Sequence, residues 1–394
     1  MSPLRKLHVP VALALAAIVA VPPAQALITF NESHDHIYVT GTVSVASDSN
    51  IFSSADGEGD YIVSSSVSAE YTRRAGWIGV NFNAGVAASN YGKFRSEDFM
   101  NPSLSMELTK KGGRTPLSFT LSANRASRAD SAVNVRTTSW NYNAGLNFRY
   151  HIVGTWDLSG GLGYSSRVYT DETVFANLAT YSGNIDLYHV LSTERDMVMG
   201  YRYRYSETSR DTHSTDHGIN GGLNGKIIRG VTGSMRLGYQ QRTSGGVGVT
   251  GDNKYDSWTA SGSTSYAFNK KSNVGLSISK DFSTTADDTS VDTLSAGAEF
   301  QYAFTSRFSS NASASWMHSQ FLGEGGRVEL DPGPPVVLGR NREDTSVALG
   351  WGLNWARTEH LRLSFSYTWS KNWSTLSFAD FVRSSYSLTL SSRW

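Results

Sequence analysis

The end of the chain alternates between large apolar and small polar side chains. Between Tyr386 and Trp394 the large apolar positions are Tyr386, Leu388, Leu390 and Trp394, and serine, threonine and arginine stand between them. A period of two places the two sets on opposite faces of a β-strand. Such a strand fits a wall with lipid on one side and water on the other, in which every backbone group bonds to a neighbouring strand.

The same alternation recurs along the chain in segments joined by turns. One segment runs through Trp140, Tyr142 and Leu146, and the next, after a turn at 151–154, through Trp156 and Leu162. Counting such segments gives about 18, an even number, as in single-chain bacterial barrels. The sequence therefore predicts an all-β fold, a transmembrane antiparallel up-and-down β-barrel.

The bulk composition fits a barrel and excludes some partners. The chain is 39% hydrophobic with a mean hydropathy of -0.32, values that arise in barrels because half of each strand faces water. Every tryptophan except Trp77 shares the parity of the apolar face, as an aromatic girdle in contact with outer-membrane lipid requires. A net charge of +1 argues against nucleic acid as a partner.

The first 26 residues have the pattern of a secretion signal. Arg5 and Lys6 form a basic start, an apolar run over 11–21 is too short to span a bilayer, and Ala24-Gln25-Ala26 is a small-x-small cleavage site. We expect a signal peptide over residues 1–26, and an outer-membrane β-barrel domain over residues 27–394 without a separate plug. The chain has no cysteine, so disulfides and thiol chemistry are excluded.

Short turns and longer loops alternate along the chain. Turns are predicted at 73–76, 110–114, 229–230, 269–272 and 305–306, and longer polar loops at 53–59, 244–253 and 321–341. Short periplasmic turns and longer extracellular loops are typical of outer-membrane barrels. The longest loop, Phe321 to Asn341, either folds into the lumen as a constriction or stays exposed.

The inward face is predicted to be mostly serine, threonine, glycine and asparagine, with scattered charges. The candidate lumen-lining charges are Glu70, Glu107, Arg149, Arg167, Arg202, Arg204, Arg236, Glu299 and Arg362. A lining of hydroxyl and amide groups suits hydrated solutes, and a barrel of this size has room for water. The arginines either form a cationic ladder that favours anions or pair with glutamates across the wall.

Catalytic, metal and cofactor sites are not predicted. The strongest candidate is a group of Asp211, His213, Asp216 and His217 in a predicted extracellular loop, which resembles the donor set of a hydrolase or a metal site. No serine–histidine arrangement or second carboxylate pair accompanies it. A non-enzymatic barrel is therefore favoured, with an outer-membrane hydrolase as a remote alternative.

Two short motifs resemble those of known outer-membrane proteins. The closing strand, which ends on an aromatic residue, resembles the C-terminal signal that the barrel insertion machinery reads. The segment Asp48-Ser49-Asn50-Ile51-Phe52, followed by Asp60-Tyr61-Ile62, resembles the Asp-x-Asn-Ile/Val-Phe opening of a large family of barrel porins. Members of that family accompany exopolysaccharide loci in Gram-negative bacteria.

The second resemblance implies a function and a set of partners. It implies a bacterial outer-membrane channel for polysaccharide export, working with periplasmic export components. The residues alone are equally consistent with diffusion of small hydrophilic solutes. The alternative of another class is a closed structural or adhesion barrel that acts through its surface loops.

Overall fold

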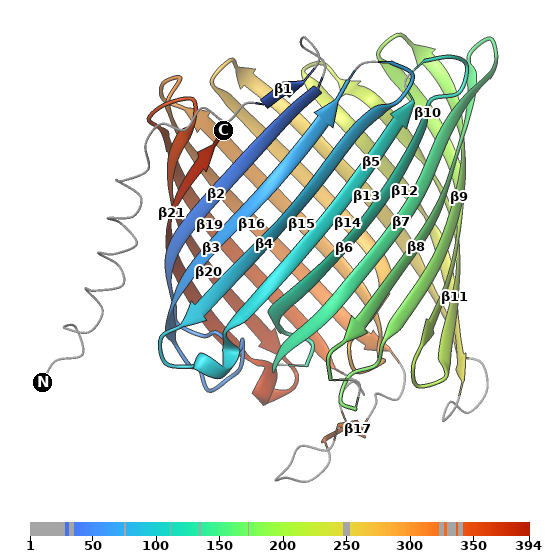
Figure 1. Cartoon of the computed structure of the whole chain (residues 1–394). Helices are drawn as coiled ribbons and strands as arrows, with labels where there is room; N and C mark the ends of the chain where they lie inside the picture. The colour runs from blue at the N-terminus through green and yellow to red at the C-terminus, as the bar shows by residue number, and fades with distance from the viewer. Residues whose placement is uncertain are drawn as a thin grey trace, which may run out of the picture.

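A computed structural model describes residues 28–30, 35–74, 76–110, 112–133, 135–171, 173–246, 253–322, 327–328, 336–337 and 342–394. Its strands form one 19-stranded antiparallel sheet (Figure 1), in which the short β1 (Ile28–Phe30) pairs only with β2. The remaining 18 strands close on themselves. The predicted fold class and strand number are confirmed. The predicted signal peptide, residues 1–26, lies outside the described residues.

The strands of the wall follow one another in sequence order. They are β2 (Asp35–Asp48), β3 (Asp60–Arg73), β4 (Gly79–Tyr91), β5 (Phe99–Lys110), β6 (Leu117–Asp130), β7 (Val135–Val153), β8 (Trp156–Tyr169), β9 (Leu178–Ser192), β10 (Arg195–Thr208), β11 (Thr212–Ile228), β12 (Val231–Gly246), β13 (Asn253–Asn269), β14 (Ser272–Thr284), β15 (Ser290–Ala303), β16 (Phe308–Leu322), β19 (Glu343–Ala356), β20 (Leu361–Ser374) and β21 (Phe381–Arg393).

The closing strand seals the barrel against the first strand of the wall. In β21, Leu388 pairs with Val45 and Leu390 pairs with Val43 of β2. The backbone of Trp394 continues this ladder, with N–H and C=O bonds of 2.9 and 2.8 Å to Val39. Closure leaves no free edge within the bilayer, where an unpaired backbone group would cost several kcal/mol.

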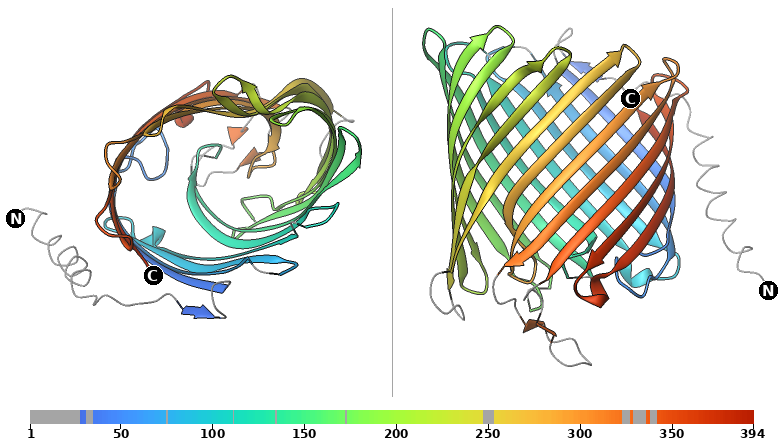
Figure 2. Two further views of the ribbon diagram at one scale, coloured as in Figure 1. Left: turned by 90° about the horizontal axis from the view of Figure 1, so that it is seen from above. Right: turned by 180° about the vertical axis from the view of Figure 1, so that it is seen from behind.

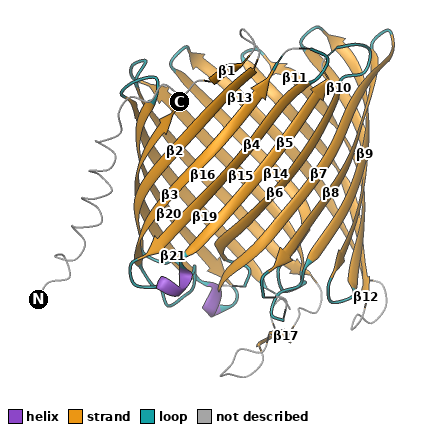
Figure 3. Cartoon of the chain, in the orientation of Figure 1, coloured by secondary structure: helices purple, strands orange, loops and turns teal. Residues whose placement is uncertain are grey.

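The two ends of the barrel differ. One end, which we call the turn end, carries the short connections and the C-terminus; the other, the loop end, carries the longer connections (Figure 1). Among the residues that the structure describes, helix is limited to two short 3-10 segments at the loop end, η2 (Arg95–Glu97) and η3 (Ser377–Ala379) (Figure 3). No helix in the described ranges has the length and apolar character of a membrane span.

The outer face of the wall is apolar and exposed. Leu162, Ile219 and Leu237 are 66%, 64% and 62% exposed, although each lies within a long regular strand. Large apolar side chains in such a continuous exposed surface indicate a partner surface, and for a closed barrel that surface is lipid. The apolar parity predicted from the sequence is therefore the outer face of the barrel.

The wall is not complete along its whole height. The β5–β6 ladder stops at Ser103–Asn124, although β5 continues beside β4 to Phe99 and β6 continues beside β7 to Asp130. We call this break the first seam. Pro102 lies next to the last pair, and proline has no N–H to extend a ladder.

A second seam divides β13 from β14. Their ladder stops at Ala260–Lys280, whereas β13 stays paired with β12 to Asn253 and β14 with β15 to Thr284. The hydroxyl of Thr259 donates to the carbonyl of Lys280 at 2.8 Å and so bonds an oxygen where the ladder ends. Both seams lie in the loop-end half.

The paired part below the second seam is long enough to cross a bilayer, and the part below the first seam, with eight pairs, is slightly shorter. Residues 103–110 and 117–124 remain paired below the first seam, and 260–269 and 272–280 below the second. A tilted strand needs about 9–11 residues to cross the hydrocarbon. The seams therefore begin close to where the strands leave the lipid. Beyond that level, water can form hydrogen bonds with the unpaired backbone groups at the strand edges.

The longest predicted loop is only partly described. Between β16 and β19 the structure describes β17 (Arg327–Val328) and β18 (Val336–Val337), which pair as a short hairpin. Most of Phe321 to Asn341 lies outside the described residues. Its direction, into the lumen or away from it, stays a prediction.

The face assignment is tested by two neighbouring positions in β21. Leu388 is exposed on the lipid face near mid-height, whereas Thr389 lies on the inner face opposite Ser44 and Ser364. Leu388→Arg should reduce the free energy of unfolding in lipid by about 2–4 kcal/mol, and Thr389→Arg should change it far less. Reversible urea unfolding in vesicles measures both, and equal losses would contradict the assignment.

Candidate functional site

The strand registers place every predicted lumen charge on the inner face. Arg202 and Arg204, for example, alternate in β10 with the exposed Tyr201 and Tyr203. Glu70 alternates with apolar neighbours in β3 in the same way, and Glu107 does so in β5.

Most of the inner arginines are paired with aspartates. Arg149 contacts Asp157 and Asp196 at 2.8 and 3.2 Å near the turn end. Arg236 contacts Asp186 at 2.7 Å. Of the two possibilities left open by the sequence, a cationic ladder or ion pairing, these arginines therefore show pairing. Their partners are aspartates and not the expected glutamates.

The other predicted charges have different surroundings. Arg167 donates to the side chain of Asn141 at 3.3 Å and to the Tyr169 hydroxyl at 3.4 Å, and Glu70 pairs with Arg393 at 2.9 Å. For Arg362, Glu107 and Glu299 the described part of the chain provides no ion-pair partner.

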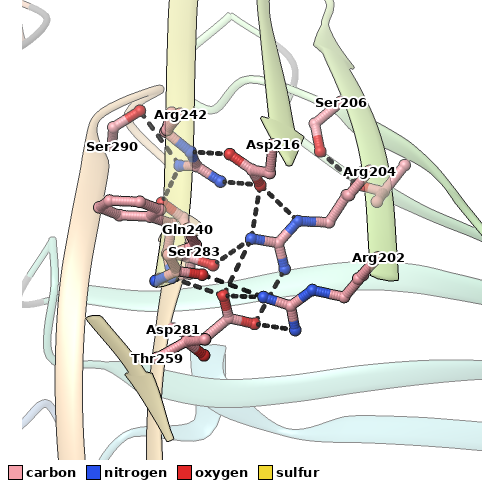
Figure 4. Close-up of polar contacts among 12 residues, drawn as sticks. Arg202, Arg204, Ser206, Asp216, Gln240, Arg242, Thr259, Asp281, Ser283 and Ser290 are labelled. Carbon is pink, nitrogen blue, oxygen red and sulfur yellow. Dashed lines mark hydrogen bonds and ion pairs between the residues drawn. The ribbon is translucent and has the colours of Figure 1, made fainter. Parts of the chain in front are cut away.

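A buried ionic cluster lies inside the loop-end half. Asp216 of β11 forms ion pairs with Arg204 of β10 at 2.6 Å and with Arg242 of β12 at 2.7 Å (Figure 4). The side chains of Arg242 and Asp216 are buried, since each residue is only 1% exposed. The Cζ atom of Arg242 lies 5.1 Å from the centre of the Phe282 ring. Such burial of charge is tolerated when each ion is paired and hydrogen-bonded.

The same cluster reaches the far side of the second seam. Asp281 of β14 accepts bonds from Arg202 at 2.8 and 3.1 Å and from Arg204 at 3.2 and 3.3 Å (Figure 4). Three strands, β11 to β13, separate β10 from β14 along the wall. The loop-end part of β14 therefore lies across the inner face of β10–β12 and does not continue alongside β13.

Side chains of β10 and β12 bond the backbone of β14 beyond the seam. Arg204 donates to the Phe282 carbonyl at 2.7 Å, and Arg242 donates to the Ser283 carbonyl at 2.8 Å. From the inner face of β13, the hydroxyl of Ser257 donates to Asp292 of β15 at 2.7 Å. The wall thus has two layers here, with the ends of β14 and β15 inside β12 and β13.

The first seam has the same construction. Arg136 of β7 has outer-face parity, yet its Cζ atom lies 5.0 Å from the ring centre of Tyr91, an inner-face residue of β4, and its Nε atom lies 3.1 Å from Glu97. Arg125 of β6 donates to the Met100 carbonyl of β5 at 3.1 Å. Figure 2 shows the teal part of the wall, around β6 and β7, running inside the outline of the other strands.

The displaced hairpins meet across the loop end. The N–H of Ala176, in the β8–β9 loop, donates to the carbonyl of Ala286, in the β14–β15 loop, at 2.8 Å. Val133 of the β6–β7 loop packs against the cluster formed by Tyr169, Phe175 and Ala286. These contacts join loops that are far apart around the wall. The β8–β9 and β14–β15 loops, for example, are separated by the six strands β9 to β14.

A further bridge fixes the β6–β7 loop. Arg342, which precedes β19 and is buried, donates to the Ser131 carbonyl at 3.0 Å and pairs with Asp344 at 2.6 Å. Strands β19–β21 and β2–β6 lie between these two segments on the shorter way round. We call the loops and strand ends that make these cross-lumen contacts the bridge.

The bridge contains two carboxyl groups whose neutral form is favoured. Burial raises the pKa of Asp287 above its ordinary value, against the opposing effect of hydrogen bonds from Thr285 and Thr289. Burial likewise raises the pKa of Asp288, which accepts a bond from Thr212 at 2.7 Å. Since folding favours protonation of both groups, docking of this loop is favoured at low pH and weakened as pH rises through the raised pKa values.

The predicted histidine and aspartate group is not a site. The expectation that it forms a loop is wrong: β11 begins at Thr212, so His213, Asp216 and His217 are strand residues that alternate between faces. Asp216 is held by arginines, and His217 bonds the Tyr201 hydroxyl at 2.7 Å on the other face. No group of three or more potential metal ligands occurs among the residues that the structure describes.

The motif behind the family resemblance has structural partners at the loop end. Asp48 pairs with Arg383 of β21 at 2.6 Å and accepts the N–H of Asn50 at 2.9 Å. Asp60 accepts the N–H groups of Lys93 and Phe94, each within 3.0 Å for at least one oxygen. These residues fix the turns between the first strands of the wall.

Comparison with known proteins identifies the fold. The sequence matches no family model and no curated protein. The structure is similar to OccK2 (OpdF) of Pseudomonas aeruginosa, solved in complex with glucuronate, with a TM-score of 0.50 and 12% identity over 93% of this chain and 99% of that one. It is also similar to the FrpB iron transporter of Neisseria meningitidis (F5-1 variant), with a TM-score of 0.50 and 12% identity.

The second likeness covers 88% of this chain, which spans 63% of the transporter's length. At such identities the likenesses show the fold alone. The chain has the fold of outer-membrane barrels.

Loss of a buried partner tests the ionic cluster. Asp216→Ala leaves the guanidinium groups of Arg204 and Arg242 without this carboxylate, so the free energy of unfolding should fall by about 3–5 kcal/mol. The matched control is Glu194→Ala, whose exposed pair with Lys226 should be worth less than about 1 kcal/mol. Denaturant titration of both variants measures the difference, and similar costs would count against a closely packed cluster.

Proposed function

We propose that the chain is a porin-like channel of the outer membrane for small hydrophilic solutes. The fold supports this proposal, because a barrel of 18 strands is wide enough for an aqueous path. On this proposal the turn end faces the periplasm and the loop end faces the exterior. Outer-membrane lipid and the barrel insertion machinery, through Tyr386, Leu388, Leu390 and Trp394, are then its expected partners.

The observation that carries the proposal is the difference between the two ends. At the turn end, the ion pairs among the described residues do not cross the lumen. They join strands that are at most three places apart in the order of the wall, as Arg149 of β7 and Asp196 of β10 are. A cavity of about 580 Å³ opens there, lined by polar and charged residues that include Glu70, Arg73, Glu107 and Lys110. A barrel built only for structure has no need of such a charged cavity.

The inner lining supports uncharged solutes. Serine, threonine and asparagine alternate with the lipid-facing residues, as in Ser64, Ser66 and Ser68 of β3. Since most inner arginines are neutralised by aspartates, the lining has no strong net preference for either sign of charge. Hydroxyl groups can exchange hydrogen bonds with sugars without a charge requirement.

Two narrower functions receive less support. Neither structural neighbour is named for polysaccharide transport, and the bridge would have to separate before a polymer could pass. A closed adhesion barrel would leave the turn-end cavity without a role. Passage of small solutes is therefore the function that the geometry favours, with polysaccharide export as the more specific possibility implied by the sequence motif.

Conductance measurements test the channel directly. Purified protein in a planar bilayer should produce stepwise conductance with a reversal potential close to zero in a potassium chloride gradient. Arg362→Glu should shift the reversal potential toward cation selectivity, because Arg362 lies on the inner face near the turn end without an ion-pair partner among the described residues.

Arg357→Glu is the matched control, since Arg357 lies in the turn between β19 and β20. It makes the same charge change outside the wall and should leave selectivity nearly unchanged. Equal shifts from both variants would contradict the assignment of Arg362 to the lumen. Absence of conductance in every variant, including those with the bridge disrupted, would overturn the channel proposal.

A further inference from the structure

The two seams and the bridge have one geometry in common. In each case a hairpin end, β6–β7 or β14–β15, has left the edge of its neighbouring strand and lies inside the barrel. Each displaced end is also tied to a distant part of the wall, by Arg342 in one case and by Arg202 and Arg204 in the other. The barrel is therefore divided at its loop end into two blocks, β6–β13 and β14–β5, whose edges overlap.

We infer that this overlap is a gate, in which the two hairpin ends move out of the lumen and pair along the seams when the channel opens. This inference rests on the proposed channel function. In the structure described here the gate is closed, because the three loops of the bridge meet across the loop end. Opening pairs the strands along both seams, except that Pro102 has no N–H to donate across the first seam.

The sequence fits the paired state as well as the overlapped state. Extending the register of β13 and β14 beyond Ala260–Lys280 places Trp258 opposite Phe282, both on the outer face. In the closed state Phe282 is 2% exposed and packs on Arg242. An aromatic pair on neighbouring strands is a favourable cross-strand contact, so Phe282 has a suitable partner in each state.

The backbone also has partners in both states. The carbonyl of Phe282 accepts a bond from Arg204 in the closed state, and this edge of β14 faces β13 in the open state. Because this carbonyl has a partner in both states, opening does not leave it unpaired. Two packings with exchangeable partners form the kind of bistable element on which gating depends.

Asp281 stabilises the closed state of the gate, and we call this residue the latch. Its carboxylate holds two arginines from β10, and it lies at the first unpaired position of β14. The cluster contains three guanidinium groups, those of Arg202, Arg204 and Arg242, against the two carboxylates of Asp216 and Asp281. Loss of Asp281 removes the ion pairs that draw β14 inward, and leaves in place the Asp216 pairs and the bonds from Arg204 and Arg242 to the carbonyls of β14.

A disulfide across the bridge tests the gate. Ala176 and Ala286 are joined by a backbone hydrogen bond and are both buried, and the chain has no natural cysteine. The double variant A176C/A286C should form a cross-link on oxidation, detected by its altered migration after denaturation. Oxidised channels should lose their large conductance steps by at least about tenfold in frequency, and reduction should restore them.

The matched control is A298C/A314C, a pair of cross-strand neighbours on β15 and β16 below the level of the seams. Its oxidation should leave conductance unchanged. If A176C/A286C cross-links fully and conductance is unaffected, the bridge is not a gate. If the cross-link never forms, the loops do not meet and the inference fails at its structural basis.

A second variant removes the latch without a cross-link. Asp281→Asn should increase the fraction of time spent in the large conductance state several-fold, whereas Asp186→Asn, which frees only Arg236 in the intact wall, should not. No change in Asp281→Asn would contradict the latch. Failure of the channel proposal is recognised separately, because then the reduced A176C/A286C and the A298C/A314C control also fail to conduct.

Discussion

The structure depends on one requirement, that every backbone N–H and C=O within the hydrocarbon be bonded inside the protein. The 18 strands meet it by closing β21 onto β2, through pairs such as Val45–Leu388. The requirement ends where the strands reach water. The ladders of β5–β6 and β13–β14 stop close to that level, and only there does the wall divide into overlapping layers.

Charged side chains take over where the ladder ends. Arg204 and Arg242 bond the carbonyls of β14, and Asp216 and Asp281 neutralise them. These inner arginines therefore stabilise the arrangement of strands at the loop end, and their charge is largely neutralised by the aspartates. The same groups lie inside the loop end of the barrel, whereas the turn end has a cavity of about 580 Å³ lined by polar and charged residues.

Alternation predicted the strands because period two reflects the lipid and water faces directly. Turns such as 229–230 lie between strands as expected, with β11 ending at Ile228 and β12 beginning at Val231. The seams were not predicted. The alternation of side chains shows which face of a strand a residue lies on, but it does not show whether that strand lies in the wall or inside it. The local signals of the seams were Pro102 and two charges on the apolar parity, Arg136 and Lys280. The acid partners were missed because Asp281 and Arg204 meet only once the wall is bent.

The most direct test of this account is hydrogen exchange resolved along the four seam strands in a lipid bilayer. The account predicts strong protection over 103–110, 117–124, 260–269 and 272–280, and faster exchange of the seam-facing amides over 99–101, 125–130, 253–259 and 281–284. Uniform protection along each of these strands would show a ladder that continues to the loop end, and would contradict the division of the wall above the membrane.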